Sequence, residues 1–189
     1  MRAEHSCFGF EAPRTDGLFF ALLPDAKALE RVAKTVQQIC IRHRLSGRPL
    51  LERAHVSLIG FGEHSGLPPA FVAGAAAAAA TMVAAPFDVT FDRAMSFLGR
   101  PRPLVLCGGE GMAELIAFQR ALGTAIRNVG LGRVKPQFTP HMTLLYDPRG
   151  IEEHAIEPVS WTARDFVLVH SLRGQGRHSS RTMAAAGLD

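Results

Sequence analysis

The stretch AHVSLIGFG, residues 54–62, is apolar enough to form a buried strand, yet it carries two polar side chains near its start. These are His55 and Ser57. The tetrapeptide HMTL repeats the arrangement with His141 and Thr143. Side chains two residues apart on a strand point to the same face. Each of the two strands therefore presents an imidazole and a hydroxyl together.

An internal repeat surrounds these two pairs. His55 follows Leu18 by 37 residues, and His141 follows Leu104 by the same distance. When the halves are aligned on this offset, the apolar stripes of two predicted helices also align, pairing Leu29 with Leu115, Val32 with Phe118 and Val36 with Leu122. Each half therefore predicts strand, helix, strand, with the His-x-Ser/Thr pair on the second strand.

The remaining pattern predicts an α+β protein. Apolar periodicity and turn residues predict helices over 25–44, 66–85 and 111–130, and strands over 17–24, 54–61, 86–93, 140–147, 164–172 and 181–186, with a hairpin over 94–109. Asp25 is expected to cap the first helix and Gly47 to end it. We expect a loose arm at 1–16 and one domain over 17–189, with pseudo-repeats of about 17–85 and 86–185.

Composition narrows the class of protein. The net charge of +4 is carried almost wholly by arginine, whose planar fork suits phosphate better than lysine does. The three cysteines, Cys7, Cys40 and Cys107, are odd in number and far apart, which favours reduced thiols over a disulfide framework. No apolar run reaches the length of a membrane helix. We therefore expect a cytoplasmic monomer that does not associate with a membrane.

The paired groups suit the in-line displacement of a phosphodiester. If the halves pack about a pseudo-twofold axis, the imidazoles of His55 and His141 converge with the hydroxyls of Ser57 and Thr143. One imidazole can take a proton from water while the other gives one to the departing alkoxide. The hydroxyls can bind the non-bridging phosphate oxygens. No metal-binding motif is present, so we expect neither a metal nor a cofactor. The residues alone do not say which histidine is the acid.

The chain resembles the two-histidine (2H) phosphoesterase superfamily, and within it the LigT-like RNA 2′,3′-cyclic phosphodiesterases, historically called 2′-5′ RNA ligases. The resemblance is carried by four stretches: LFFA at 18–21, HVSLIGFGE at 55–63, FTPHMTL at 138–144 and FVLVHSL at 166–172. It implies a bilobal fold of duplicated halves, with two antiparallel sheets around a central cleft and helices outside.

The resemblance also implies an activity: the opening of a 2′,3′-cyclic phosphate, on RNA or a small nucleotide, to a 2′-phosphomonoester. It implies His55 as the proton donor and His141 as the proton acceptor. Many LigT-like proteins carry arginine five residues after the second histidine, where this chain has Tyr146, which we consider for base stacking. Three alternatives stay open: another small phosphodiester, such as a 2′-5′-linked oligonucleotide or an ADP-ribose cyclic phosphate, a non-catalytic RNA-binding relative, and a metal hydrolase.

Overall fold

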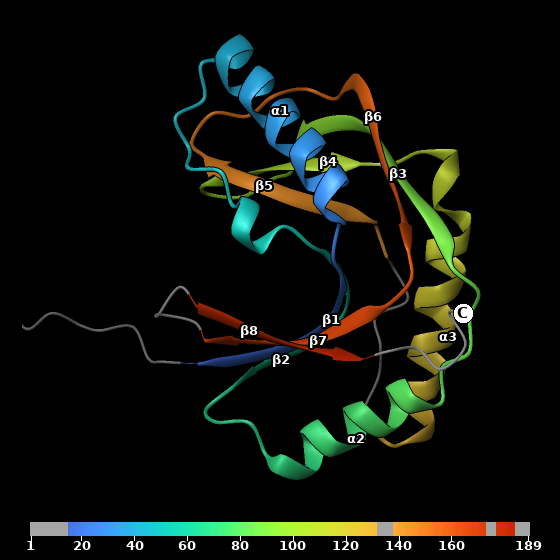
Figure 1. The fold of residues 1–189 in the computed structure, drawn as a ribbon. Helices are drawn as coiled ribbons and strands as arrows, with labels where there is room; N and C mark the ends of the chain where they lie inside the picture. The colour runs from blue at the N-terminus through green and yellow to red at the C-terminus, as the bar shows by residue number, and fades with distance from the viewer. Residues whose placement is uncertain (1–14, 132–137, 173–176, 184–189) are drawn as a thin grey trace, which may run out of the picture.

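Eight antiparallel strands form one strongly curved sheet in the computed structural model, which describes residues 15–131, 138–172 and 177–183 (Figure 1). Their order across the sheet is β6-β3-β4-β5-β2-β1-β7-β8. The bounds are β1 Asp16–Leu22, β2 Val56–His64, β3 Phe87–Ser96, β4 Arg102–Cys107, β5 His141–Asp147, β6 His154–Ala163, β7 Phe166–Leu172 and β8 Arg177–Met183.

The sheet divides into two lobes of four strands. β5 and β2 are the inner strands of the two lobes, and the register joins them at the pair Val56 and Met142. Each of these residues directly follows a histidine of the repeated pair. The fold is therefore bilobal and α+β as predicted, but the two expected antiparallel sheets are joined at this pair into one sheet, and the seam runs beside both histidines.

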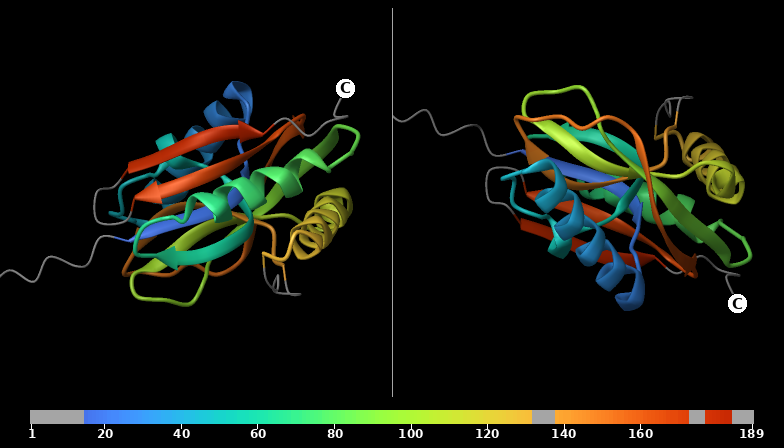
Figure 2. Two further views of the ribbon diagram at one scale, coloured as in Figure 1. Left: turned by 90° about the horizontal axis from the view of Figure 1, so that it is seen from below. Right: turned by 90° about the horizontal axis from the view of Figure 1, so that it is seen from above.

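The strand–helix–strand repeat is confirmed. β1, α1 (Ala26–His43) and β2 form the first unit, and β4, α3 (Ala113–Asn128) and β5 form the second. Helix α1 crosses to the other lobe and packs on β6, while α3 packs with α2 (Pro69–Ala80) and contacts β2 and β3. Figure 2 shows α1 in front when the molecule is seen from above and α2 in front when it is seen from below.

A shared apolar core holds the helices to the sheet. The ring of Phe166 on β7 lies 5.5 Å from that of Phe20 on β1 and 5.3 Å from that of Phe118 on α3, as measured between centroids. All three side chains are buried. Burying one such ring contributes roughly 1.5–3 kcal/mol, so contacts between distant segments fix the position of the strands that carry the histidines.

Strand β6 is the element that the sequence pattern missed. It contains Pro158, and a proline inside an apolar run argues against a central strand. The structure resolves the conflict because β6 lies at the edge of the sheet and pairs with β3 alone. One side of an edge strand has no neighbouring strand. A proline whose nitrogen faces that side therefore removes no hydrogen bond between strands.

The first helix has nearly the predicted bounds, but the prediction that Gly47 ends it was wrong. Helix α1 begins as expected, with the Asp25 carboxylate accepting from the Ala28 N–H at 2.7 Å. It ends at His43, and Arg44 takes the left-handed conformation (φ 53°) expected of glycine. Gly47 serves another purpose, because a Cβ there would lie 2.2 Å from the carbonyl oxygen of Tyr146. It allows the loop after α1 to pack against β5.

Other predicted bounds shift by a few residues. The helix expected over 66–85 is shorter at both ends: Pro68 and Pro69 start it late, and its last residue is Ala80. The last strand begins earlier than the predicted 181–186, and residues 184–186 lie outside the described part of the chain, as does the predicted arm apart from its last two residues. Cys40 and Cys107 are free thiols. Among the described residues, no helix combines the length and apolar character needed to cross a membrane.

Candidate active site

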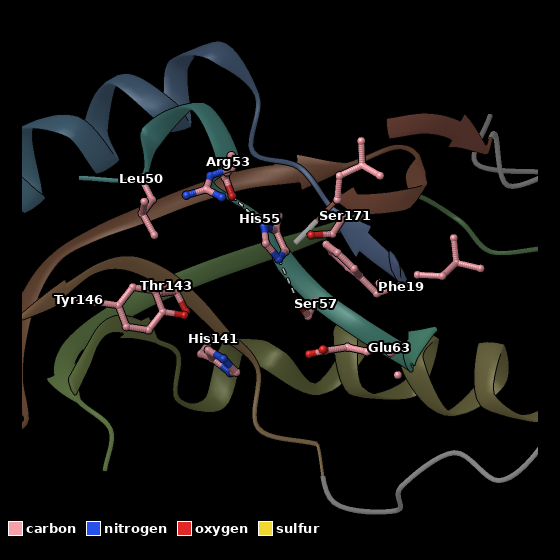
Figure 3. Close-up of a pocket in the computed structure, with 15 residues that line it drawn as sticks. Phe19, Leu50, Arg53, His55, Ser57, Glu63, His141, Thr143, Tyr146 and Ser171 are labelled. Atoms are coloured by element: carbon pink, nitrogen blue, oxygen red, sulfur yellow. Dashed lines mark hydrogen bonds between the residues drawn. The ribbon is translucent and has the colours of Figure 1, made fainter. Parts of the chain in front are cut away.

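All five residues singled out from the sequence line one cavity of about 600 Å³ (Figure 3). His55 directly precedes β2 and Ser57 lies on it in one lobe, whereas His141, Thr143 and Tyr146 come from β5 of the other. The rest of the lining comes from β1, β7, the end of β2 and the turn before it: Gly17, Leu18, Phe19, Leu50, Arg53, Gly60, Gly62, Glu63, Ser171 and Leu172.

The two histidine rings are held by the same kind of bond. The Nδ1–H of His55 donates to the carbonyl oxygen of Arg53 at 2.7 Å, and that of His141 donates to the carbonyl oxygen of Thr139 at 2.8 Å. A carbonyl can only accept, so Nδ1 carries the proton in both neutral rings. Nε2 of each ring is therefore the atom that can accept a proton or, after protonation, release one.

Ser57 stands beside the reactive nitrogen of His55. Its Oγ lies 3.0 Å from Nε2 of that ring. With Nδ1 protonated, the neutral ring accepts at Nε2 from the Ser57 hydroxyl; once charged, the ring can donate there instead. The alternation of the strand brings these two groups together, since residues i and i+2 share a face.

Burial lowers the pKa of His55 below its ordinary value. The hydrogen bond to the Arg53 carbonyl opposes this shift, while the positive charges of His141 and Arg53 add to it. Desolvation and like charge both disfavour the imidazolium. The charged form of His55 is therefore disfavoured at this position, and an anionic ligand would favour it again.

Each histidine ring also packs against a phenylalanine. Phe19 of β1 lies 5.0 Å from His55, and Phe97, just after β3, lies 5.0 Å from His141, as measured between ring centroids. Sequence reasoning missed both contacts. Phe19 falls within the quoted LFFA stretch, but its position gives no sign of the partner, and nothing local marks Phe97. These packed rings restrict how the imidazoles can turn.

Charge is distributed unevenly along the cavity. Arg53 lies at the end that also holds Leu50 and Tyr146, whereas Glu63 and Phe19 lie toward the other end (Figure 3). Arg53 belongs to a short 3₁₀ turn, Leu51–Arg53, directly before β2. Sequence analysis did not select Arg53 or Glu63. The available signal was their placement two residues before and eight residues after the first histidine.

The described part of the chain brings together no group of three histidine, cysteine, aspartate or glutamate side chains that could hold a metal ion. The hydroxyl of Ser57 lies beside Nε2 of His55, and the hydroxyl of Thr143 lines the same cavity. Such groups donate hydrogen bonds to an anion, and they are weak ligands for a cation.

Two pseudo-symmetric strands that bring His-x-Ser/Thr pairs to one cavity define a two-histidine phosphoesterase. The chain belongs to the 2′-5′ RNA ligase superfamily, whose family model matches residues 23–175. It is similar to E. coli LigT in its apo form, with 25% identity, a TM-score of 0.69, and coverage of 89% of this chain and 95% of that one.

Two further solved structures share the fold. One is described as a phosphoesterase, with 23% identity, a TM-score of 0.67, and coverage of 88% of this chain and 95% of that one. The other is the TT0787 protein of Thermus thermophilus, with 18% identity, a TM-score of 0.68, and coverage of 92% and 100%. No curated protein sequence matches the chain significantly.

Proposed function

We propose that this protein hydrolyses 2′,3′-cyclic phosphodiesters, at RNA ends or on small nucleotides, to 2′-phosphomonoesters without a metal ion. The observation that carries the proposal is the pair of tethered imidazoles, His55 and His141, which line one cavity from opposite lobes. Each ring keeps Nε2 available because Nδ1 is bonded to a main-chain carbonyl. Two positioned imidazoles, a side chain that can both accept and donate a proton near neutral pH, are what acid–base catalysis requires.

The reaction needs one proton acceptor and one proton donor. Water attacks phosphorus as Nε2 of His141 takes its proton, so a new P–O bond forms. The bond from phosphorus to the 3′ oxygen breaks, and Nε2–H of His55 protonates that oxygen as it leaves. The 2′ ester remains, and solvent resets the two rings. The choice of His55 as donor follows the family resemblance, because the pseudo-symmetric geometry does not distinguish the roles.

The two hydroxyls would stabilise the charge of the transition state. Ser57 and Thr143 line the cavity, each two residues after a histidine. Their O–H groups can donate to the non-bridging oxygens, on which negative charge is held as the fifth oxygen ligand arrives at phosphorus. This division of labour explains why each histidine is followed, two residues on, by a hydroxyl.

Substrate binding also supplies the protonation that His55 needs. Burial and nearby positive charge lower its pKa. A bound phosphodiester brings a negative charge next to the ring, and opposite charge favours the imidazolium. A bound phosphodiester would therefore favour the charged form of the donor.

The ligands of related structures agree with this substrate class. E. coli LigT has been crystallised with 3′-AMP, with phosphate and with ATP. The family resemblance and the arginine at one end of the cavity also favour a phosphate-bearing nucleotide over a neutral ligand.

The test is to incubate the protein with nucleoside 2′,3′-cyclic phosphates in excess EDTA and to identify the product by ³¹P NMR. We expect a 2′-phosphomonoester in wild type and its formation at a rate at least about 10²-fold lower in the His141→Ala variant. A 3′-phosphate product would contradict the assignment of the leaving oxygen. Activity that EDTA abolishes and a divalent ion restores would favour a metal hydrolase, and binding without turnover would favour a non-catalytic relative.

A further inference from the structure

Exposed arginines gather around the end of β5, just beyond the cavity residue Tyr146, and we call them the arginine track. It is made by side chains from the loop after α1, the β3–β4 turn and the residues after β5: Arg44, Arg48, Arg100, Arg102 and Arg149. All five side chains are exposed. None belongs to the His-x-Ser/Thr pairs or lines the cavity itself.

A buried carboxylate joins two parts of the track. Asp147, at the end of β5, is 1% exposed and accepts from the N–H groups of Ser46 at 2.6 Å, Gly47 at 2.8 Å and Arg149 at 2.9 Å. Arg149 also donates through Nη1 to the carbonyl oxygen of Arg44. These bonds fix the loop after α1 against the end of β5, at one edge of the upper lobe in Figure 1.

The β3–β4 turn supplies the other side of the track. Arg102 pairs with Asp147 in the register of β4 and β5, and Pro103 pairs with Tyr146. The guanidinium of Arg102 extends over the turn after β5, because a Cβ on Gly150 would lie 2.6 Å from its Nη1. Arg100 lies in the same exposed turn. The track therefore surrounds the end of β5.

Tyr146 connects the track to the cavity. It lines the cavity and is 50% exposed, while Leu98 in the β3–β4 turn is 91% exposed. Exposed apolar and aromatic side chains among arginines suit a single-stranded nucleic acid. Its unstacked bases can stack on these side chains while its phosphates bind the guanidinium groups. A free mononucleotide would leave this surface unused.

The distribution of charge along the cavity indicates the direction in which a bound RNA strand would leave it. A cyclic phosphate placed between the histidines leaves the base and the 5′ phosphate of the same ribose to extend in different directions. Glu63 at the far end repels a phosphate, whereas Arg53, Leu50 and Tyr146 lie at the end next to the track. We propose that the arginine track binds the single-stranded RNA upstream of the cyclic phosphate, so that RNA ends are preferred over mononucleotides. This inference rests on the proposed function.

The experiment compares two substrates that share a terminal nucleoside. One is the nucleoside 2′,3′-cyclic phosphate, and the other is an RNA of about ten nucleotides ending in the same cyclic phosphate. The wild-type kcat/KM should be higher for the RNA. It should also fall more steeply with salt, measured between about 50 and 200 mM, because each bound phosphate releases counterions.

The variants remove charge from either side of the track. Arg100→Ala with Arg102→Ala, and separately Arg48→Ala with Arg149→Ala, should each lower kcat/KM on the RNA by about 5- to 10-fold, mainly through KM. The salt slope on the RNA should fall by about 0.7 for each phosphate that the variant no longer binds. The mononucleotide rate should stay within about twofold of wild type, because the track lies outside the cavity.

The control pair is Arg31→Ala with Arg120→Ala, which removes two exposed arginines from α1 and α3. Arg31 is thirteen residues from Arg44 along α1, a rise of about 20 Å. The control should leave both substrates unchanged. Equal losses on both substrates in the track variants, or an equal loss on the RNA in the control, would overturn the inference.

A binding measurement separates the two proposals. Fluorescence anisotropy with a 5′-labelled RNA that ends in a 2′-phosphate needs no turnover. If the protein hydrolyses mononucleotides but shows no dependence on RNA length, the track inference fails and the proposed function stands. If neither substrate is hydrolysed but RNA binding weakens in the track variants, the proposed function fails, and the arginine track is still supported as an RNA-binding surface.

Discussion

His55 and His141 hold their rings by equivalent bonds, each from Nδ1 to the carbonyl oxygen of the residue two positions earlier. The strands that carry them belong to different lobes and meet at the pair Val56 and Met142. The two imidazoles thus have the same tautomer and related positions on either side of the seam. Their surroundings differ, because the ring of His55 packs on Phe19 and that of His141 on Phe97.

Replacing either histidine by alanine should lower turnover by about 10²- to 10⁴-fold, the usual contribution of a positioned acid or base. A nitrophenyl phosphodiester distinguishes the roles, because its leaving group departs without a proton. His55→Ala should recover much of its loss on that substrate, whereas His141→Ala should remain impaired because water still needs activation.

His154→Ala is the matched control for these variants. His154 also bonds the carbonyl oxygen of the residue two positions earlier, at 3.1 Å, but it lies outside the cavity. It should keep wild-type activity. Thermal melts of all three variants exclude unfolding as the cause. If the nitrophenyl substrate rescued His55→Ala and His141→Ala equally, acid–base catalysis would still hold but the assignment of donor and acceptor would be refuted. Full activity in either variant would refute the mechanism.

Ser57→Ala and Thr143→Ala should each lower turnover by about 10²-fold or less, because each removes one of several donors to phosphate. Thr143→Ser and Ser57→Thr keep the hydroxyl and should restore most of the rate. Steady-state kinetics on a nucleoside 2′,3′-cyclic phosphate measure the effect. If the conservative variants were as impaired as the alanine variants, packing would explain the loss better than hydrogen bonding.

The pKa of His55 should lie below the ordinary value of 6.5 in the free protein, because burial is the largest effect on it. Inorganic phosphate should raise the pKa by adding negative charge, and His141→Ala should raise it by removing a positive neighbour. NMR titration of the ring C–H signals measures both shifts. A pKa at or above 6.5 in the free protein would contradict this account of the site.

The dependence of kcat/KM on pH should be bell-shaped, because one imidazole must be neutral and the other charged. The two limbs belong to the pair and not to either residue, since the charge of His141 acts on His55. Activity should therefore fall both as the acceptor gains its proton at low pH and as the donor loses its proton at high pH. A single limb would show that only one titrating group is required.

Asp147 should stabilise the fold more at neutral than at acid pH. The Arg149 N–H, together with those of Ser46 and Gly47, holds the pKa of this carboxyl below its ordinary value of 3.8. Its charged form is favoured in the folded state, so its contribution is present above pH 3.8 and is lost as the pH falls through the lower folded pKa. Asp147→Asn should lower the Tm at about pH 7, and by less near pH 3.

The exposed carboxylate of Asp165 provides the comparison for that experiment. Asp165→Asn should change the Tm little at either pH, because its side chain is exposed. Melting curves followed by circular dichroism at both pH values give the difference. A constant loss for Asp147→Asn across this range would show that its charge is not what stabilises the loop.

The sequence by itself determined which residue types share a face and which segments correspond. Strand alternation placed His55 with Ser57 and His141 with Thr143, and the common offset predicted the repeated strand–helix–strand unit. These features depend on local periodicity, which the chain carries in any context. The Asp25 cap was predictable for the same reason, because its partner is only three residues away.

The tertiary structure alone decided which segments meet around those residues. Long-range burial put the two histidine strands side by side, placed β6 at an edge despite Pro158, and brought Phe97 onto His141. It also set Arg53 and Glu63 toward opposite ends of one cavity and gathered the arginine track around β5. Such contacts join residues far apart in the chain. Their free energy comes from packing across the whole core, which no local pattern records.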